Sequence, residues 1–236
     1  MNISDKNTPL VLLPGHMCDA RLFGPQIAAL SDRQCFVGDL ATDNNVSAIA
    51  RRLLLTAPPR FALLGLSMGG IVAFEILRQA PERIARLALL DTNPLPESDD
   101  RSSARLELMR IVAAGGLKSV VTERLKPAYL ARANREDRPL LDLIIAMALE
   151  LGPAVFDRQA RALLERPDSR ELLQNIHVPT LVLCGREDAL CPVVMHEAMA
   201  AAIPGAMLVV IDAAGHLPTL ESPAAVNTAV RRWLDS

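Results

Sequence analysis

Short apolar runs bounded by turn residues recur along the chain, and they alternate with stretches whose apolar residues have helical spacing. Such runs are typical of strands that are buried on both faces, as in a parallel sheet covered by helices. The alternation predicts an α/β fold with a mostly parallel, doubly wound sheet. The expected strands are Leu10 to Leu13, Cys35 to Val37, Phe61 to Leu64, Leu87 to Leu90, Leu181 to Cys184 and Met207 to Ile211, and the expected helices are Val46 to Ala57, Met68 to Ala80, Val193 to Ile203 and Ala224 to Leu234.

The region from about Pro94 to Gln174 breaks this alternation, because its pattern is helical throughout and it offers no strand candidate. We expect an all-helical insertion between two strands, forming a cap over the carboxyl edge of the sheet, where open α/β sheets bind ligands. The predicted domains are a core of residues 1–93 and 175–236 and a helical cap of residues 94–174.

The charge and composition of the chain restrict the classes of partner that it can bind. The chain has 25 basic and 27 acidic residues, a net charge of -2, and no basic block, so we expect a small-molecule substrate and neither nucleic acid nor membrane as a partner. The longest apolar runs look too short to span a bilayer. The oligomeric state stays open between monomer and dimer.

Two features predict a cytoplasmic protein. The first residues lack the basic segment and long apolar segment of a secretory signal. The cysteines have neither CxxC pairing nor dense disulfide spacing, so we expect free thiols. They are Cys18, Cys35, Cys184 and Cys191.

One motif stands between an expected strand and an expected helix: Gly65-Leu66-Ser67-Met68-Gly69. In a nucleophile elbow, the strand-to-helix turn strains the backbone of its central serine and leaves room only for small neighbours, which Gly65 and Gly69 supply. The start of the helix brings free N–H groups and a partial positive charge, which would stabilise an oxyanion. Ser67 is therefore the candidate nucleophile, rather than a serine that merely connects two elements, and the Met68 N–H is one candidate oxyanion donor.

A serine hydroxyl is a weak nucleophile unless a neighbouring base takes its proton, so a histidine must reach it. His216 follows the expected strand Met207 to Ile211, which should place it at the carboxyl edge with Ser67. His196 lies within a helical stretch and His177 lies at the amino end of a strand, so both are expected to be surface or packing residues. His216 is the candidate base.

The histidine needs a carboxylate to fix its tautomer and to stabilise the imidazolium. Asp188 follows the expected strand Leu181 to Cys184 and is the favoured acid. Asp91, which ends another strand, is the second choice, and Glu187 is a further alternative. Asp188 could instead be a turn or cap residue ahead of the next helix.

Ser67, Asp188 and His216 follow the chain order of the catalytic triad in α/β-hydrolases. With these motifs the chain resembles the α/β-hydrolase fold family, specifically its small members with a helical cap, over nearly its whole length. The resemblance implies that Ser67 is the nucleophile, His216 the general base and Asp188 the orienting acid, with no cofactor. No metal is expected, because the histidines lack the spacing of zinc ligands.

In that family, the turn after an early strand usually reads His-Gly, followed by a residue whose backbone N–H completes the oxyanion hole. Here the turn reads Leu13-Pro14-Gly15-His16-Met17, so proline replaces the usual histidine. The donor position falls on His16, with Met17 as the alternative if the turn is wider. The family also commonly has two antiparallel strands ahead of this segment, and only about eight residues precede it here, so we expect about six strands.

The resemblance implies a carboxylic ester hydrolase that forms an acyl-enzyme. Haloalkane dehalogenases have aspartate at the position of Ser67, and carbon–carbon bond hydrolases often have asparagine at the position of Leu66. The elbow is similar to that of enol-lactonases and small carboxylesterases, which favours an ester, lactone or thioester with a small acyl group. The alternatives are a carbon–carbon bond hydrolase, an acyltransferase or perhydrolase, and a non-catalytic hydrolase-like binding protein.

The expected cap is rich in Leu, Ala, Ile, Met and Val and has only Tyr129 and Phe156 as aromatic residues, so an aliphatic pocket is expected. Its arginines could bind a substrate carboxylate, but we expect them to form a solvated helix face. They include Arg105, Arg110, Arg124, Arg132 and Arg158.

Overall fold

A parallel sheet forms the centre of the molecule in the computed structural model, which describes residues 8–125 and 129–236. Six strands follow the order β2-β1-β3-β4-β5-β6, and each neighbouring pair is parallel. The expected α/β fold with a mostly parallel sheet is confirmed. The strands are β1 Leu10–Leu13, β2 Cys35–Val37, β3 Phe61–Leu66, β4 Ile84–Leu90, β5 Thr180–Gly185 and β6 Met207–Ile211.

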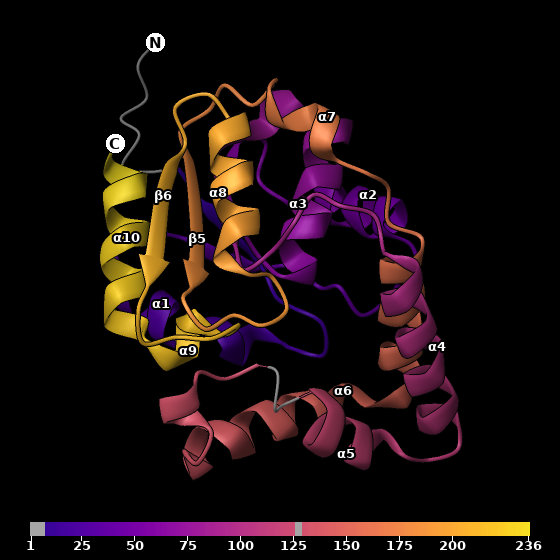
Figure 1. Cartoon of the computed structure of the whole chain (residues 1–236). Helices are drawn as coiled ribbons and strands as arrows, with labels where there is room; N and C mark the ends of the chain where they lie inside the picture. The colour runs from indigo at the N-terminus through magenta and orange to yellow at the C-terminus, as the bar shows by residue number, and fades with distance from the viewer. Residues whose placement is uncertain (1–7, 126–128) are drawn as a thin grey trace.

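Helices cover both faces of this sheet. Alternate residues of a strand point to opposite sides, so each face presents apolar side chains that helices bury. On one face, α1 (Gly24–Ala29) and α10 (Pro223–Asp235) meet a cluster that includes Leu64 and the buried Trp233. On the other face, α2 (Val46–Thr56), α3 (Met68–Gln79) and α8 (Val193–Ala202) pack against residues such as Leu63 (Figure 1). The sheet is therefore doubly wound.

The segment between β4 and β5 contains helices and loops and no strand in its described residues. Figure 1 shows α5 and part of α6 across the end of the sheet toward which the arrowheads of β5 and β6 point. The helical elements here are α4 Asp99–Ala113, α5 Leu117–Ser119, the π-helix η4 Val120–Leu125, the 3-10 helix η6 Arg132–Asn134, α6 Arg138–Leu164 and α7 Arg170–Leu173. The expected all-helical cap insertion is confirmed.

The cap has an apolar cluster of its own, in which Val112 of α4, Val120 of η4 and Phe156 of α6 are buried. Met17, from the loop after β1, belongs to the same cluster. Because this loop follows a central strand, the cluster links the cap directly to the sheet.

Helix α6 corrects one expectation, since its length and a mean hydropathy of 1.8 over its most apolar window are sufficient for a membrane span. The helix is broken, however, at Gly152, whose φ of 79° and ψ of 175° are non-helical, and Pro153 follows directly. The segments on either side of the break are each shorter than the roughly 20 residues that a span requires. Some of their apolar side chains, including Ile144 and Phe156, are buried within the protein, whereas Leu149 is exposed.

The turn between β3 and α3 has two positions, 65 and 69, at which only glycine fits. A Cβ at Gly69 would lie 2.0 Å from the carbonyl oxygen of Leu13, and a Cβ at Gly65 would lie 2.3 Å from the carbonyl oxygen of Gly69. Both neighbours are backbone atoms, so neither contact can relax by side-chain rotation. The two glycines let β1, β3 and α3 approach closely around the turn.

We expect Gly69→Ala to lower the free energy of unfolding by about 3 kcal/mol, because the added methyl forces β1 away from α3. Urea denaturation measures the change. Gly24→Ala is the matched control, since a Cβ there meets nothing within 4 Å apart from its chain neighbours and the φ of -49° is helical. Alanine at position 24 is expected to change the free energy of unfolding by less than about 1 kcal/mol, because the lower freedom of the unfolded chain is offset by the contact between its Cβ and the following Pro25. Equal stability of the two variants would contradict the close approach.

Candidate active site

Ser67 lies at the turn between β3 and α3, with a φ of 54° and a ψ of -114°. A positive φ is strained for a residue with a Cβ, and the surrounding contacts hold it in place. The Ser67 N–H donates to the Leu90 carbonyl at 2.9 Å, and the Thr92 hydroxyl donates to the Ser67 carbonyl at 2.8 Å. The backbone of β4 and its following loop therefore fixes the serine.

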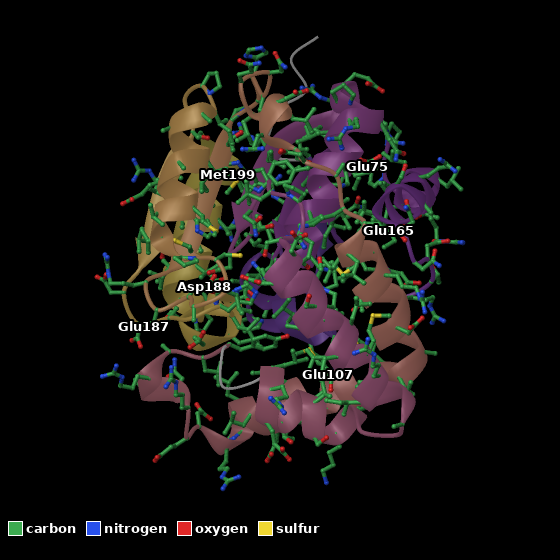
Figure 2. The ribbon with its side chains drawn as sticks, turned by 45° about the vertical axis from the view of Figure 1, so that its right-hand side comes forward. Glu75, Glu107, Glu165, Glu187, Asp188 and Met199 are labelled. Carbon is green, nitrogen blue, oxygen red and sulfur yellow. The ribbon has the colours of Figure 1, made fainter. Side chains whose placement is uncertain are left out.

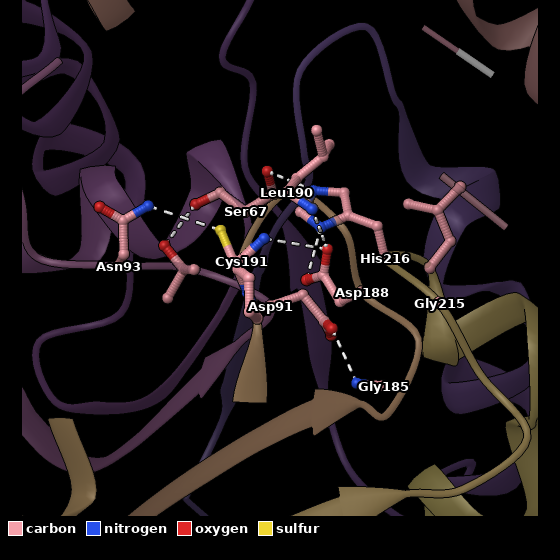
Figure 3. Close-up of polar contacts among 12 residues, drawn as sticks. Ser67, Asp91, Asn93, Gly185, Asp188, Leu190, Cys191, Gly215 and His216 are labelled. Atoms are coloured by element: carbon pink, nitrogen blue, oxygen red, sulfur yellow. Dashed lines mark hydrogen bonds and ion pairs between the residues drawn. The ribbon is translucent and has the colours of Figure 1, made fainter. Parts of the chain in front are cut away.

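His216 approaches Ser67 from the loop between β6 and α9 (Pro218–Glu221). Its Nε2 lies 2.9 Å from Ser67 Oγ, and its Nδ1 lies 2.8 Å from Asp188 Oδ2 (Figure 3). An ionised carboxylate only accepts, so Nδ1 carries the proton that it donates to Asp188. In the neutral ring, Nε2 is then the acceptor for the Ser67 hydroxyl.

Asp188 follows β5 and is 4% exposed. Its Oδ1 accepts the N–H groups of Leu190 at 2.8 Å and Cys191 at 3.0 Å, which leaves Oδ2 for His216. Burial alone would raise the pKa of Asp188, but the charge and hydrogen bond of His216, together with the two backbone N–H groups, outweigh burial and hold this pKa below its usual value. Asp188 is thus an anion at neutral pH.

Asp91 lies beside Asp188 and differs from it in protonation. It is fully buried at a φ of 44°, and its Oδ1 accepts the Gly185 N–H at 2.9 Å (Figure 3). Burial, and then the negative charge of Asp188, raise the pKa of Asp91 well above its usual value. A neutral carboxyl cannot stabilise an imidazolium by charge, so the favoured choice of Asp188 over Asp91 is consistent with the geometry.

Glu187, the other alternative, is exposed and points away from the site (Figure 2). Its Oε2 accepts the backbone N–H of Arg132 at 2.9 Å, and so it contacts the cap. The structure therefore brings Ser67, His216 and Asp188 together and leaves Glu187 outside.

Glu221 of α9 holds the loop that carries His216, a contact that sequence reasoning missed. Its Oε1 accepts the N–H groups of Gly215 at 2.8 Å and Leu217 at 3.2 Å, on either side of the histidine. Its Oε2 accepts the N–H of Ala131 at 2.7 Å. One carboxylate thus fixes both the histidine loop and the cap.

The turn after β1 offers two candidate oxyanion donors, His16 and Met17, and Gln159 of α6 distinguishes between them. The Met17 N–H donates to Gln159 Oε1 at 2.8 Å and is thereby occupied. Within the described part of the chain, the N–H groups of His16 and Met68 have no acceptor. Of the two donors expected in the first turn, His16 is therefore the available one, and Met68 remains available at the start of α3.

The other histidines lie in different surroundings. His196 is buried, and its Nε2 accepts the Thr92 N–H at 3.1 Å, so it is a packing residue as expected. His177 is exposed and lies outside the cavity at Ser67. The His16 ring contacts Phe156 edge-on at 5.1 Å between centroids. Burial, and then the charge of Arg105, lower the pKa of His16 to about 3, so its ring is neutral.

Cys191 lies close to the acid and the base, and the possible ligand atoms of Asp188, Cys191 and His216 lie within 4.8 Å of one another. The hydrogen bond between the Asp188 carboxylate and the His216 imidazole already uses the two atoms that face each other. Burial, and then the charge of Asp188, raise the pKa of the Cys191 thiol to about 12. A neutral thiol is a poor metal ligand, so the cluster suits proton transfer better than metal binding.

A cavity of about 220 Å³ opens at Ser67 and His216. Leucines line part of it, as expected for an aliphatic pocket, but the expectation is incomplete because arginines line it as well. Arg105, whose side chain is 14% exposed, belongs to the lining, which corrects the expected solvated face for this residue. Arg124 belongs to the lining as well but is exposed, and the Arg110 side chain is 74% exposed, both as expected. Arg101 and Arg166 also line the cavity and were not anticipated.

Among curated proteins, the chain is similar to the pimeloyl-[acyl-carrier protein] methyl ester esterase of Klebsiella pneumoniae (strain 342). The two are 26% identical over 192 residues, which cover 77% of this chain and 72% of that protein.

Two solved structures have the same fold. An esterase from Thermogutta terrifontis with malate bound is 32% identical, with a TM-score of 0.87 and coverage of 97% of this chain and 90% of that one. The enol-lactonase from Burkholderia xenovorans LB400 is 23% identical, with a TM-score of 0.86 and coverage of 98% and 92%. The resemblance to small esterases and enol-lactonases is thus confirmed. The family model described as the alpha/beta hydrolase family matches residues 10–229, and the chain belongs to that family.

Proposed function

We propose that the protein is a serine hydrolase that cleaves a small carboxylic ester, lactone or thioester through an acyl-enzyme on Ser67. The observation that carries the proposal is the continuous hydrogen-bonded series from Ser67 Oγ to His216 Nε2 at 2.9 Å and from His216 Nδ1 to Asp188 Oδ2 at 2.8 Å. The esterase that is 32% identical, and the methyl ester esterase among the curated relatives, support an ester substrate.

In the first half of the reaction, Ser67 Oγ attacks the carbonyl carbon as its proton passes to His216 Nε2. The carbonyl oxygen becomes an oxyanion, which the His16 and Met68 N–H groups stabilise. The intermediate then expels the alcohol or thiol, which takes the proton from His216, and the acyl group remains on Ser67. Asp188 stabilises the imidazolium while it exists.

In the second half, water attacks the acyl carbon and gives a proton to His216 Nε2. The second intermediate expels Ser67 Oγ, which takes that proton back, and the acid is released. One ester and one water thus give one acid and one alcohol, and each step uses a group that lies within hydrogen-bond distance of the next.

A fluorophosphonate tests the proposal, because it reacts only with an activated serine. We expect intact mass spectrometry to detect a single adduct and peptide mapping to place it on Ser67. Ser67→Ala should take up no label, and Ser103→Ala, which changes an exposed serine, should be labelled like the parent protein. Labelling at another serine, or no labelling of the folded protein, would contradict the proposal.

A further inference from the structure

One face of α4 brings positive charge to the cavity at Ser67. Arg101, Ala104, Arg105 and Leu108 all line the cavity, and their spacing of three and four residues places them on one side of the helix. Arg124 of η4 and Arg166, which follows α6, complete the arginine set. No aspartate or glutamate belongs to the described lining of this cavity. The cavity that contains the candidate nucleophile is therefore cationic.

Glu97 is the carboxylate nearest to these arginines, and three of them share it. Arg105 contacts its Oε2 at 2.6 Å, Arg166 contacts the same oxygen at 2.8 Å, and Arg101 contacts Oε1 at 3.2 Å. The side chains of Glu97 and Arg166 are 1% and 3% exposed and that of Arg105 is 14% exposed, whereas Arg101 is 40% exposed and reaches water. Three guanidinium groups against one carboxylate leave a net positive charge, and the two buried guanidinium groups share a single carboxylate, which favours the binding of a further anion.

Arg124 adds a further positive charge to the cavity, and it differs from the other three arginines in its exposure and hydrogen bonding. It is exposed, and it has no ion pair or side-chain hydrogen bond among the described residues. Arg166, by contrast, donates to the carbonyls of Leu95 and Leu163 and has a structural role. Arg124 therefore has free donors at the cavity, whereas Arg166 has few.

Two titrating groups respond to this positive field. The pKa of His16 is lowered first by burial and second by the charge of Arg105. The pKa of Arg166 is lowered by burial and further by the charges of Arg101 and Arg105, although Glu97 acts in the opposite direction. The field of the α4 arginines thus reaches the His16 ring, which borders the candidate oxyanion site.

We propose that the ester cleaved at Ser67 carries a second functional group, a free carboxylate, which binds at the wall formed by Arg101, Arg105 and Arg124. This inference rests on the proposed hydrolase function and narrows its substrate to anionic esters. Guanidinium groups suit a carboxylate because they donate two parallel hydrogen bonds to it. A cavity of about 220 Å³ favours a short chain between the ester and the carboxylate.

The first test compares esters of matched length. We expect the parent protein to hydrolyse monomethyl adipate with a kcat/KM at least about tenfold above that for methyl hexanoate, because a hydrogen-bonded charge pair contributes this much. The anion 4-acetoxybutyrate carries its carboxylate on the alcohol side and serves as the second arm. Its neutral counterpart is butyl acetate, as methyl hexanoate is for monomethyl adipate. A preference for either anion over its own neutral counterpart supports the proposal and assigns the side, while the absence of such a preference for both anions overturns it.

The second test uses variants. Arg124→Gln removes a charge that the described residues do not pair, so folding should be unaffected, and we expect kcat/KM for the preferred anion to fall about tenfold or more. The ratio of this value to kcat/KM for its neutral counterpart should fall as well, because the neutral ester has no charge for Arg124 to bind. Arg110→Gln is the matched control, because it removes the same charge from α4 outside the cavity. An equal loss of kcat/KM for the anion in both variants would mean that only the net charge of the protein matters. This result would overturn the proposal that the carboxylate binds at the arginine wall.

A binding measurement separates this inference from the proposed function. Calorimetry with adipate should detect binding to the parent protein and at least about tenfold weaker binding to Arg124→Gln. If Ser67 takes no fluorophosphonate but adipate binds in this way, the hydrolase proposal fails and the anion site stands. If Ser67 is labelled and neutral esters are hydrolysed, but adipate binds neither protein, the hydrolase stands and the anion site fails.

Discussion

Replacing Ser67 with alanine is expected to lower kcat/KM for an ester substrate by about 10⁵-fold or more. The reason is that the hydroxyl is the atom that bonds to the acyl group, and no other described serine or threonine hydroxyl lies at hydrogen-bond distance from His216 Nε2. The oxyanion donors and the cavity are unchanged in this variant, so a small residual rate above that of water is expected. Steady-state kinetics with a chromogenic ester measures the loss.

The stability of this variant should be close to that of the parent protein. Alanine has a Cβ like serine, so the strain at a φ of 54° is retained, and urea denaturation should give a change below about 1 kcal/mol. Ser67→Gly is the matched control. It should be equally inactive but more stable by about 1 kcal/mol, because glycine adopts a positive φ without strain. Full activity of either variant would exclude Ser67 as the nucleophile.

The strands could be predicted from the sequence because each is a local apolar run bounded by turn residues. Burial on both faces holds for the inner strands β1, β3, β4 and β5, whereas the edge strands β2 and β6 are only partly buried. The structure extends several of them, such as β3 to Leu66 and β4 back to Ile84, but changes none in kind. The elbow could be predicted for the same local reason, since Gly65, Ser67 and Gly69 are neighbours in the chain. Asp188 and His216 followed from the rule that carboxyl ends of parallel strands meet at one edge.

The remaining parts of the site depend on contacts between distant segments. Gln159 bonds to Met17 across 142 positions, and Glu221 bonds to Ala131 across 90. Neither contact can be predicted from the periodicity of the sequence, because a polar residue in a helical pattern is expected to face solvent. The arginine wall was obscured for the same reason. Arg105 and Arg110 lie on one helix, and only the packing of α4 distinguishes the residue at the cavity from the solvated one.

Asp188→Asn is expected to lower kcat/KM by about 10³–10⁴-fold. The amide carries no negative charge, so the imidazolium loses its electrostatic stabilisation. The amide can also donate to His216 Nδ1, which favours the tautomer with its proton on Nε2. Asp91→Asn is the matched control, because it makes the same change beside Asp188 in a carboxyl that is already neutral. We expect its kcat/KM to stay within about threefold of the parent value. The reverse ranking would assign the role of the acid to Asp91.

The same Asp91→Asn variant is expected to differ from the parent protein in the pH dependence of stability. The pKa of Asp91 is raised in the folded state by burial and by the charge of Asp188, whereas in the unfolded chain it is near 4. Above about pH 4 the folded protein therefore keeps a proton that the unfolded chain releases, so this group makes the parent protein less stable as pH rises. Asparagine has no such proton, and its amide N–H can donate to Asp188 as the protonated carboxyl does. In urea denaturation, Asp91→Asn should match the parent protein near pH 4 and exceed its free energy of unfolding increasingly toward pH 8, whereas a growing deficit would mean that Asp91 is ionised in the folded state.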